Sequence, residues 1–261
     1  MKKYSCCVIT GASSGIGLEL ARLIAPMTSR LVLVARTESR LREISAELEQ
    51  KQGVETSYLL ADLEKQGSGE TLWSEIQSMG LYPDVWVNNA GFGLYGSSLE
   101  LSLEREQAMI QLNITALVTL STLAARSMAL LGGGTVLNVS SVAAFLPGPR
   151  MAVYFASKAF VLSYSQALNE ELSKQGVRVL VLCPGSTRTD FHKIAGTERV
   201  KAMHQLSSMS ATDVAKSALA QMQSGNSVNI PGLLNQLMVF SSRLVPRRLG
   251  TWLSGHVLRV D

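Results

Sequence analysis

Residues 4–17 read YSCCVITGASSGIG, and this stretch decides the fold. Residues 4–10 form a short apolar, β-branched run that predicts a buried strand. The glycines that follow permit a tight turn, and a helical pattern then covers residues 18–24. A strand, a glycine turn and a helix in this order are the context that a dinucleotide site requires, because the N–H groups at a helix N-terminus can bind a pyrophosphate. Taken alone the loop is a weak signal, since any strand-to-helix turn can carry glycines.

Six further short apolar runs alternate with helical patterns along the chain. The expected strands cover residues 4–10, 30–35, 54–60, 84–87, 134–139, 177–182 and 227–230. The expected helices cover residues 18–24, 38–50, 68–79, 103–130, 151–174 and 212–223, and the fourth is interrupted around Asn113. This alternation predicts an α/β fold, a doubly wound parallel sheet of about seven strands with helices on both faces. Because no repeat or linker interrupts the pattern, we expect residues 1–261 to form a single domain.

Composition and charge exclude several classes of protein. Hydrophobic residues make up 46% of the chain and charged residues 17%, which favours a folded core over disorder. The net charge is only +4. The sequence lacks the dense basic stripe with interleaved aromatics that a nucleic-acid-binding surface would show, so we expect no nucleic-acid partner. The cysteines and histidines lack metal-ligand spacing, so we expect no metal site. The first apolar run is too short for a secretion signal, and no apolar stretch has the length of a membrane span, so we expect a cytoplasmic protein.

The carboxyl ends of the predicted strands carry polar residues and glycines, and ligands of such folds bind at that edge of the sheet. Arg36 follows the second strand, at the position that faces the adenosine ribose, and its charged fork suits a 2′-phosphate. Glu38 could compete for Arg36, although it also suits the start of the next helix. Asp62 ends the third strand and could accept from an adenine amino group or cap a helix. We therefore expect NADP(H) as the cofactor.

Tyr154 and Lys158 lie four residues apart in a segment of helical composition, residues 151–174, that has no proline or glycine. On a helix this spacing puts the ammonium of Lys158 beside the phenol of Tyr154. A nearby cation favours phenolate, so we expect Lys158, helped by a second positive charge, to lower the pKa of Tyr154 from about 10 towards about 7. A tyrosine and a lysine four residues apart often occur by chance. The polar residues and glycines at the strand ends are what favour a catalytic site here.

Together these motifs resemble the classical short-chain dehydrogenase/reductase family over nearly the whole chain. The matching pieces are Thr10-Gly11-x-x-x-Gly15-x-Gly17, Asp62, Asn88-Asn89-Ala90-Gly91, Asn113, Ser141, Tyr154-x-x-x-Lys158 and Pro184-Gly185 with Thr189. The resemblance implies a Rossmann-type enzyme that transfers a hydride between a nicotinamide and a carbonyl or secondary alcohol. It also selects Ser141 over Ser140, because the serine of such enzymes lies thirteen residues before the tyrosine.

The resemblance implies a role for each matching residue. Tyr154 exchanges the proton at the substrate oxygen, and Ser141 hydrogen-bonds the same oxygen. Lys158 lowers the tyrosine pKa and holds the nicotinamide ribose, while Asn113 holds a water that relays protons to Lys158. Residues 88–91 resemble a support for the sheet beside the cofactor. The expected cofactor-binding residues are Gly11, Ser13, Ser14, Gly15, Ile16, Gly17, Arg36, Asp62, Leu63, Asn89, Ala90, Gly91, Tyr154, Lys158, Pro184, Gly185, Thr187 and Thr189.

Substrate choice is expected to depend on segments outside these motifs. Residues 92–97, 142–151 and a substrate loop at about 186–211 should line the pocket, and the loop should be mobile with short helical pieces. Their apolar side chains predict an apolar small-molecule substrate, and the residues concerned are Ala143, Phe145, Leu146, Met151, Val153, Phe191 and Met203.

The C-terminal tail, residues 233–261, combines apolar side chains at partly helical spacing with four arginines. We expect Pro246 to break it into two helices. Three interpretations stay open for this tail: a lid at the substrate entrance, a cover for the sheet edge or a subunit interface, and an anchor on a membrane surface.

Two functions from different classes follow. The first is an NADP(H)-dependent carbonyl reductase, or the reverse alcohol dehydrogenase, for which the resemblance implies a homodimer or homotetramer. The second is a non-catalytic dinucleotide-binding sensor on the same fold. A sensor would not need Tyr154, Lys158 and Ser141 together with Asn113, which favours the enzyme.

Overall fold

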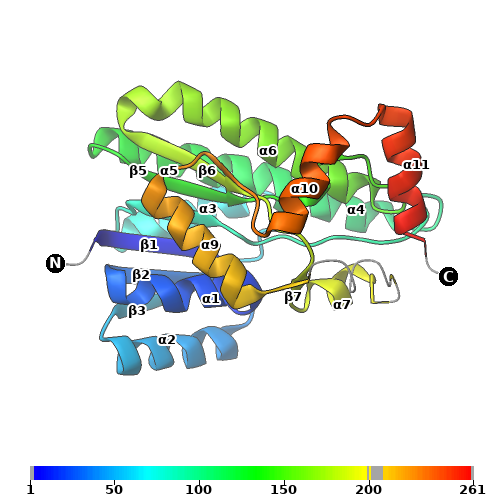
Figure 1. Cartoon of the computed structure of the whole chain (residues 1–261). Coiled ribbons are helices and arrows are strands. Elements are labelled where there is room, and N and C mark those ends of the chain that lie inside the picture. The colour runs from blue at the N-terminus through cyan, green and yellow to red at the C-terminus, as the bar shows by residue number, and fades with distance from the viewer. Residues whose placement is uncertain (1–2, 199, 201–207, 260–261) are drawn as a thin grey trace.

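The centre of the protein is a parallel sheet of seven strands in the order β3-β2-β1-β4-β5-β6-β9 (Figure 1). The computed structural model describes residues 3–198, 200 and 208–259. The strands are β1 Tyr4–Thr10, β2 Thr28–Ala35, β3 Glu55–Leu60, β4 Val85–Asn88, β5 Gly134–Val139, β6 Val177–Leu182 and β9 Val228–Asn229. The predicted doubly wound sheet is therefore confirmed, with every strand end within two residues of its predicted place.

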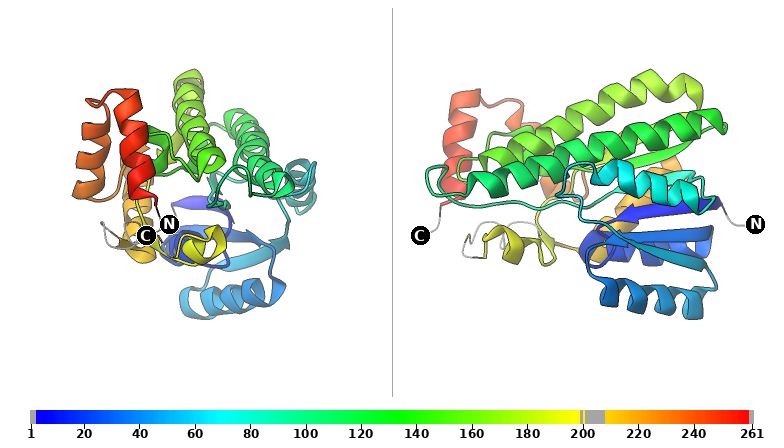
Figure 2. Two further views of the ribbon diagram at one scale, coloured as in Figure 1. Left: turned by 90° about the vertical axis from the view of Figure 1, so that its right-hand side faces the viewer. Right: turned by 180° about the vertical axis from the view of Figure 1, so that it is seen from behind.

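Helices cover both faces of the sheet because alternate side chains of the buried strands point to opposite faces. In β1, Cys7 and Ile9 enter one apolar core, whereas Cys6 and Val8 enter the other. The first face carries α1 Gly15–Ile24, α2 Glu38–Gln52 and α9 Ala211–Ser224. The second carries α3 Ser68–Ser78, α4 Leu103–Ile110, α5 Leu117–Leu130 and α6 Ala152–Leu172, of which α5 and α6 lie side by side (Figure 2).

Asn113 lies where α4 passes into α5 through the π-helical segment Gln111–Ala116. The expected interruption of this helix is thus a π-bulge, a feature that often marks functional sites. By length and composition Leu103–Leu130 could cross a membrane, so the expectation that no apolar stretch has that length is wrong. Half of its apolar window, 50%, is buried inside the protein, as in a core helix of a globular domain.

The expected substrate loop contains three short elements in its described part. Thr187–Arg188 (β7) and Met209–Ser210 (β8) form a small parallel pair, and Phe191–Ala195 (α7) lies between them in the chain. Residues 199 and 201–207, which include Met203, lie outside the described residues.

The tail forms two helices, α10 Leu233–Ser242 and α11 Arg247–Val257, and Pro246 is the N-cap of the second. The predicted break at Pro246 is confirmed. Both helices lie beyond the carboxyl edge of the sheet (Figure 1). The phenol of Tyr95 donates a hydrogen bond of 2.6 Å to the carbonyl of Leu258, which ties the end of the tail to the loop after β4.

Candidate active site at the carboxyl edge of the sheet

A single cavity of about 740 Å³ runs along the carboxyl edge of the sheet. It begins at the glycine loop, passes Tyr154 and Lys158, and ends against the tail helices. Fifteen of the sixteen expected cofactor-binding residues outside the catalytic pair line it. Those that line it are Gly11, Ser13, Ser14, Gly15, Ile16, Arg36, Asp62, Leu63, Asn89, Ala90, Gly91, Pro184, Gly185, Thr187 and Thr189. The tertiary structure thus brings the strand-end motifs to one place, as the parallel sheet predicts.

Gly17 is expected to touch a cofactor, but it is not among the residues that line the cavity. A Cβ atom on Gly17 would lie 2.5 Å from the side-chain nitrogen of Asn89 and would also meet the carbonyl oxygen of Gly11. Asn89 in turn donates hydrogen bonds of 3.0 Å to the Thr10 carbonyl and 3.1 Å to the Gly11 carbonyl. The missing side chain of Gly17 therefore leaves room for the Asn89 side chain, which holds the glycine loop by these hydrogen bonds.

The glycine loop fits the phosphates of a dinucleotide. Gly11 has φ +65, a left-handed conformation that favours glycine. Ser14 is the N-cap of α1, and its side chain makes no capping hydrogen bond within the described structure. The first N–H groups of α1 consequently face the cavity without a side-chain partner, and a helix N-terminus of this kind attracts anions.

Three charged side chains meet at the end of the cavity expected to hold the adenosine. Glu64 forms salt bridges of 2.5 Å with Arg36 and 2.7 Å with Arg105, and its side chain is only 12% exposed. Glu38 instead pairs with Arg42 at 2.6 Å, so the competitor for Arg36 is Glu64 and not Glu38. Sequence reasoning missed Glu64 and Arg105, because the two lie 41 residues apart and no local spacing links them.

Asp62 stands at the same end of the cavity, where β3 has ended. Its carboxylate accepts a 3.3 Å hydrogen bond from the backbone N–H of Glu64 and lies 3.9 Å from the ammonium of Lys65. Asp62 thus shapes the turn after β3, and it also lines the cavity in the position expected for an adenine contact.

Tyr154 and Lys158 lie one turn apart on α6, and both side chains are buried. The Lys158 ammonium donates a 3.0 Å hydrogen bond to the carbonyl of Val139 and lies 5.8 Å from the centre of the Tyr154 ring. Ser141 follows β5 and lines the cavity with them. Ser140 also borders the cavity, but its hydroxyl donates a 2.7 Å hydrogen bond to the Lys158 carbonyl and fastens α6 to the end of β5.

The protein alone sets the pKa values of this pair in directions that the sequence did not predict. Burial raises the pKa of Tyr154 to about 12, and hydrogen bonding with Ser141 acts in the opposite direction. Burial lowers the pKa of Lys158 to about 8, and the electrostatic interaction with Cys183 opposes that change. In the protein by itself Lys158 does not lower the Tyr154 pKa, and the lowering expected with the help of a second positive charge stays a prediction. The physical reason is that burial destabilises the phenolate by removing it from water, and this effect exceeds its attraction to the Lys158 ammonium, which is bonded to the Val139 carbonyl.

Asn113 lies behind the catalytic pair and does not line the cavity. Its side-chain nitrogen donates to the Phe92 carbonyl at 3.0 Å and to the Ser157 hydroxyl at 3.1 Å, and its oxygen accepts from the Phe92 N–H at 3.2 Å. A Cβ on Gly91 would lie 3.0 Å from this oxygen and 3.5 Å from the Lys158 ammonium. Gly91 therefore lies between the side chains of Asn113 and Lys158, and its lack of a side chain lets both come close to it.

The far wall of the cavity is apolar. Of the residues expected there, Ala143, Leu146 and Phe191 line it, whereas Phe145, Met151 and Val153 do not. Met151 belongs instead to the buried cluster beneath Tyr154. The residues that the sequence did not assign to this wall include Leu112, Phe155, Met238, Val245, Leu253, Val257 and Leu258. Most of these belong to the tail, so the tail is a wall of the cavity.

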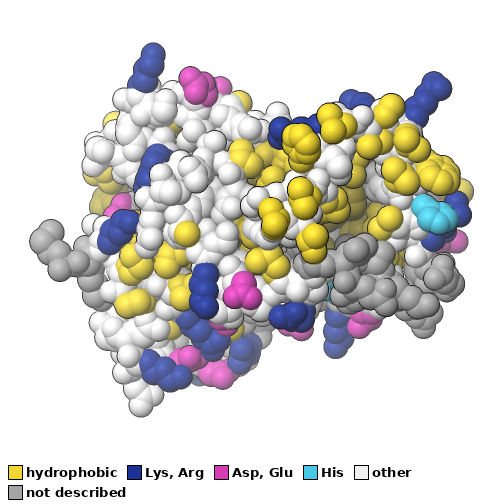
Figure 3. Space-filling model, viewed as in Figure 1, with side chains coloured by type: hydrophobic (Ala, Val, Ile, Leu, Met, Phe, Trp, Pro, Cys, Tyr) yellow, Lys and Arg dark blue, Asp and Glu magenta, His cyan; other side chains and the backbone are white. Residues whose placement is uncertain are grey.

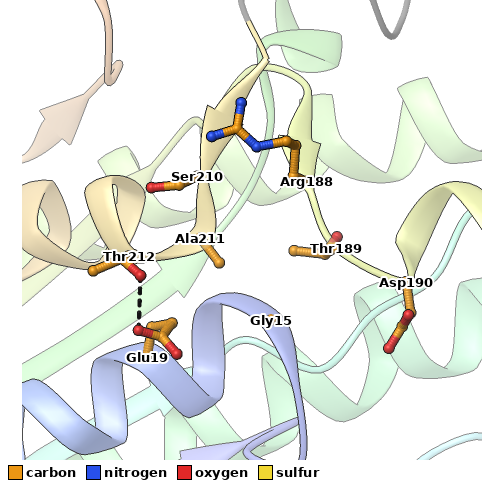
Figure 4. Close-up of a pocket in the computed structure, with 8 residues that line it drawn as sticks. All are labelled: Gly15, Glu19, Arg188, Thr189, Asp190, Ser210, Ala211 and Thr212. Carbon is orange, nitrogen blue, oxygen red and sulfur yellow. Dashed lines mark hydrogen bonds between the residues drawn. The ribbon is translucent and has the colours of Figure 1, made fainter.

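A second, smaller depression of about 330 Å³ lies on the other side of the α1 N-terminus (Figure 4). It is polar, and the hydroxyl of Thr212 donates a 2.8 Å hydrogen bond to Glu19 across its floor. It shares Gly15, Thr189 and Asp190 with the main cavity and contains none of the expected catalytic residues. The chemistry therefore belongs to the larger cavity.

Comparison with known proteins identifies the family. The family model described as short chain dehydrogenase matches residues 5–200. The chain therefore belongs to the short-chain dehydrogenase family, as its motifs predicted. This is a family of oxidoreductases, and its fold binds a nicotinamide dinucleotide.

Three similar proteins show the range of the likeness. The 17-beta-hydroxysteroid dehydrogenase type 3 of Rattus norvegicus is 35% identical over 195 residues, which are 74% of this chain and 63% of that protein. The chain thus spans less than two thirds of the length of this relative. A short-chain dehydrogenase from Sphingobium yanoikuyae in complex with NADPH is 32% identical, with a TM-score of 0.82 over 92% of this chain and 94% of that one. A bulky-bulky ketone specific alcohol dehydrogenase from Comamonas testosteroni is 29% identical, with a TM-score of 0.78 over 93% and 94%.

Proposed function

We propose that this protein is an NADP(H)-dependent oxidoreductase that interconverts a bulky apolar ketone and the corresponding secondary alcohol. The observation that carries the proposal is the continuity of one cavity. Arg36 lies at its first end, Tyr154 lies at its centre with Ser141 and Lys158, and an apolar wall closes its other end. A sensor would need the first part of this cavity but not the other two.

Tyr154 is the proton donor in the direction of reduction. Because burial holds the pKa of Tyr154 at about 12, the phenol keeps its proton at neutral pH and can give it to a carbonyl oxygen. Ser141, at the same part of the cavity, supplies a second hydrogen bond to that oxygen. The bound cofactor supplies the hydride. The buried ammonium of Lys158, 5.8 Å from the Tyr154 ring, stabilises the phenolate that remains.

Asn113 acts through Lys158 and Tyr154, as a positioning residue. Its side chain holds the backbone of Phe92 and donates a hydrogen bond to the Ser157 hydroxyl. That hydroxyl in turn donates a hydrogen bond of 2.7 Å to the Tyr154 carbonyl. Fixing these groups keeps the phenol and the ammonium on one side of the cavity.

The preference for NADP(H) rests on Arg36 and Arg105 at the adenosine end. Two guanidinium groups against the single carboxylate of Glu64 leave one net positive charge where a 2′-phosphate would lie. The complex of the Sphingobium yanoikuyae relative with NADPH agrees with this preference.

The proposed substrate class rests on the size and lining of the cavity. A volume of about 740 Å³ holds a cofactor and leaves an apolar space beyond Tyr154. The names of two relatives, a 17-beta-hydroxysteroid dehydrogenase and a bulky-bulky ketone specific alcohol dehydrogenase, point to the same class of large apolar ketones.

The experiment is a screen of carbonyl compounds of increasing bulk, from small aldehydes to diaryl and steroid ketones, with very long acyl thioesters as a separate group. The loss of NADPH absorbance is followed for the wild type and for Tyr154→Phe. Turnover of bulky ketones by the wild type alone supports the proposal. NADPH binding with no turnover of any carbonyl, and no oxidation of the matching alcohols, would favour the sensor.

We also propose that the protein forms a homodimer or homotetramer through the helices that carry Asn113 and Tyr154. Leu103, Ile110 and Phe160 expose apolar surface on α4 and α6, which supports an interface there. Light scattering of Phe160→Glu tests it, with a smaller assembly as the expected result. The cytoplasmic location and the single domain stay predictions from the sequence.

A further inference from the structure

The tail helices expose an unusual amount of apolar side chain. We call this surface the tail face, and ten large apolar residues that are each 43% exposed or more define it. They are Leu233, Leu234, Leu237, Met238, Phe240, Leu244, Leu249, Trp252, Leu253 and Val257. Figure 3 shows apolar side chains gathered over α10 and α11 around a hollow. Clusters of this kind mark interaction surfaces, because monomeric proteins rarely leave so many large apolar residues together in water.

The charge of the described tail has one sign. Arg243, Arg247, Arg248 and Arg259 are all exposed, and residues 233–259 contain no aspartate or glutamate. Among the described residues none of these arginines forms a salt bridge, whereas Arg22, Arg30 and Arg36 in the first half of the chain each do. The described tail therefore combines the apolar tail face with a positive charge that has no counter-charge within residues 233–259.

One of the two aromatic residues of the tail face, Trp252, suits a boundary between water and hydrocarbon. Trp252 is exposed, and its ring stacks on His256 with a distance of 5.7 Å between the ring centres. Tryptophan is amphipathic, since its large apolar ring carries an N–H that seeks a polar partner, and it is enriched where bilayers meet water.

The cavity reaches the tail face. Met238 on α10 and Leu253 on α11 line the cavity and are also exposed on the surface. The two helices therefore form both the apolar wall of the cavity and the apolar outer face, and the cavity lies directly beneath that face.

We propose that the tail face docks on a lipid bilayer that contains anionic lipids. Leucine, phenylalanine and tryptophan side chains would enter the interface, while the arginines bind the headgroup phosphates. Charge complementarity selects this occupant over a second copy of the chain. Two tail faces brought together by a two-fold axis would join two surfaces with four arginines each, and residues 233–259 supply no aspartate or glutamate to offset that charge. Docking would also set the cavity against the bilayer, where large apolar ketones partition.

The first test measures binding of the purified full chain to vesicles by co-sedimentation. Vesicles of phosphatidylcholine are compared with vesicles of phosphatidylcholine and phosphatidylserine, at low and at high salt. We expect binding to the anionic vesicles that weakens with salt, because the headgroup attraction is screened. Equal binding to both kinds of vesicle, or to neither, would overturn the proposal.

Two matched pairs of variants separate the charge from the apolar contribution. Arg243→Gln/Arg247→Gln/Arg248→Gln should weaken binding roughly a hundred-fold, since each basic residue at an anionic surface contributes about a factor of five. Its control, Arg126→Gln/Lys174→Gln/Lys216→Gln, removes the same charge from exposed positions elsewhere and should bind like the wild type.

The apolar pair consists of Phe240→Ser/Leu244→Ser/Trp252→Ser, which should lose binding, and Tyr82→Ser/Leu99→Ser/Leu130→Ser, which removes exposed apolar residues elsewhere and should retain it. None of the three altered tail residues lines the cavity. Equal binding by a variant and its control would refute the role of the tail face.

A third measurement does not depend on any variant folding. Trp252 is exposed, whereas Trp86 is buried, so the tryptophan emission of the wild type should shift to shorter wavelength when anionic vesicles are added. Analytical ultracentrifugation gives the competing result. A change of assembly size in Phe240→Ser/Leu244→Ser/Trp252→Ser, with no emission shift of the wild type on vesicles, would make the tail face a subunit interface and overturn the proposal.

Discussion

The guanidinium of Arg36 and the carboxylate of Glu64 form a salt bridge of 2.5 Å at the adenosine end of the cavity. Arg36 comes directly after β2 and Glu64 lies beyond β3, so the parallel pairing of these two strands brings them together. Glu64 also holds Arg105 on α4. Any phosphate that binds Arg36 must therefore compete with Glu64, and this competition sets the cofactor preference.

Glu64→Gln should strengthen the binding of NADPH more than that of NADH. The change removes a negative charge that faces the 2′-phosphate and leaves both arginines in place. Titration calorimetry with each cofactor measures the effect, and Glu38→Gln is the matched control because Glu38 pairs with Arg42 instead. Weaker NADPH binding in Glu64→Gln would mean that Glu64 acts mainly by holding Arg36 in position.

Arg36→Asp should reverse the cofactor preference. A charged hydrogen bond contributes roughly 1.5–3 kcal/mol, so its loss should cost about ten- to a hundred-fold in NADPH affinity. The new carboxylate would accept from the ribose hydroxyl of NADH. Ratios of kcat/KM for the two cofactors check this, and equal ratios in the wild type would remove the basis of the prediction.

Tyr154→Phe should lose turnover while it still binds the cofactor. The substitution keeps the buried ring and removes the phenol that gives its proton to the carbonyl, a contribution of about 10²–10⁴-fold. Stopped-flow measurement of hydride transfer and fluorescence titration with NADPH separate the two effects. A rate above about a tenth of the wild type would show that another group supplies the proton.

Lys158 should make the folded state more stable as the pH rises from about 8 towards 10.5. Burial lowers its pKa from 10.5 to about 8, so in this interval the unfolded chain binds a proton that the folded protein does not. The free energy of unfolding then rises by up to about 1.4 kcal/mol per pH unit, and below about pH 8 the contribution is constant.

Urea unfolding of the wild type and of Lys158→Met measures this effect as the difference between the two at each pH. Lys216→Met, at an exposed position on α9, is the control. The series stops near pH 10, because above it Tyr154, whose pKa is raised to about 12, makes stability fall with pH. If the difference in the free energy of unfolding stays constant between pH 8 and 10, burial does not lower the pKa of Lys158.

Asn113→Ala should lower both stability and turnover. The backbone N–H and carbonyl of Phe92 would lose their partner in a buried place, which costs about 1–3 kcal/mol. Gln111→Ala, in the same π-helical segment, is the control for helix propensity. Thermal unfolding gives the stability, and kcat for the best ketone of the screen gives the activity. If only stability falls, Asn113 is a structural residue alone.

Truncation before Leu233 should raise KM for bulky ketones and leave NADPH binding nearly unchanged. The deletion removes one wall of the cavity but none of the residues expected to bind the cofactor. Tyr95→Phe is a milder form of the same change, because it removes only the 2.6 Å bond to Leu258. Unchanged kinetics on every substrate in both variants would show that the tail takes no part in substrate binding.

Local patterns in the sequence were sufficient for most of the fold. The seven strands are short apolar runs between turn residues, and each was found within two residues of its end because hydrophobic periodicity is a property of a few neighbouring residues. The break at Pro246 followed from the chemistry of proline alone. At Asn113 the sequence predicted only an interruption of the helix and not its π-helical form. That form depends on the hydrogen bonds of Asn113 with Phe92 and Ser157.

The sequence by itself determined which residues lie at the carboxyl edge of the sheet, because strand order and glycine spacing place them there whatever the details of packing. Only the tertiary structure decided how those residues are tuned. Glu64 meets Arg36 and Arg105 across 28 and 41 residues of chain. Burial rather than Lys158 sets the pKa of Tyr154. The tail becomes a wall of the cavity by folding back from the far end of the chain. Each of these depends on distances through space and on the exclusion of water, and neither quantity is encoded in the spacing of neighbouring residues.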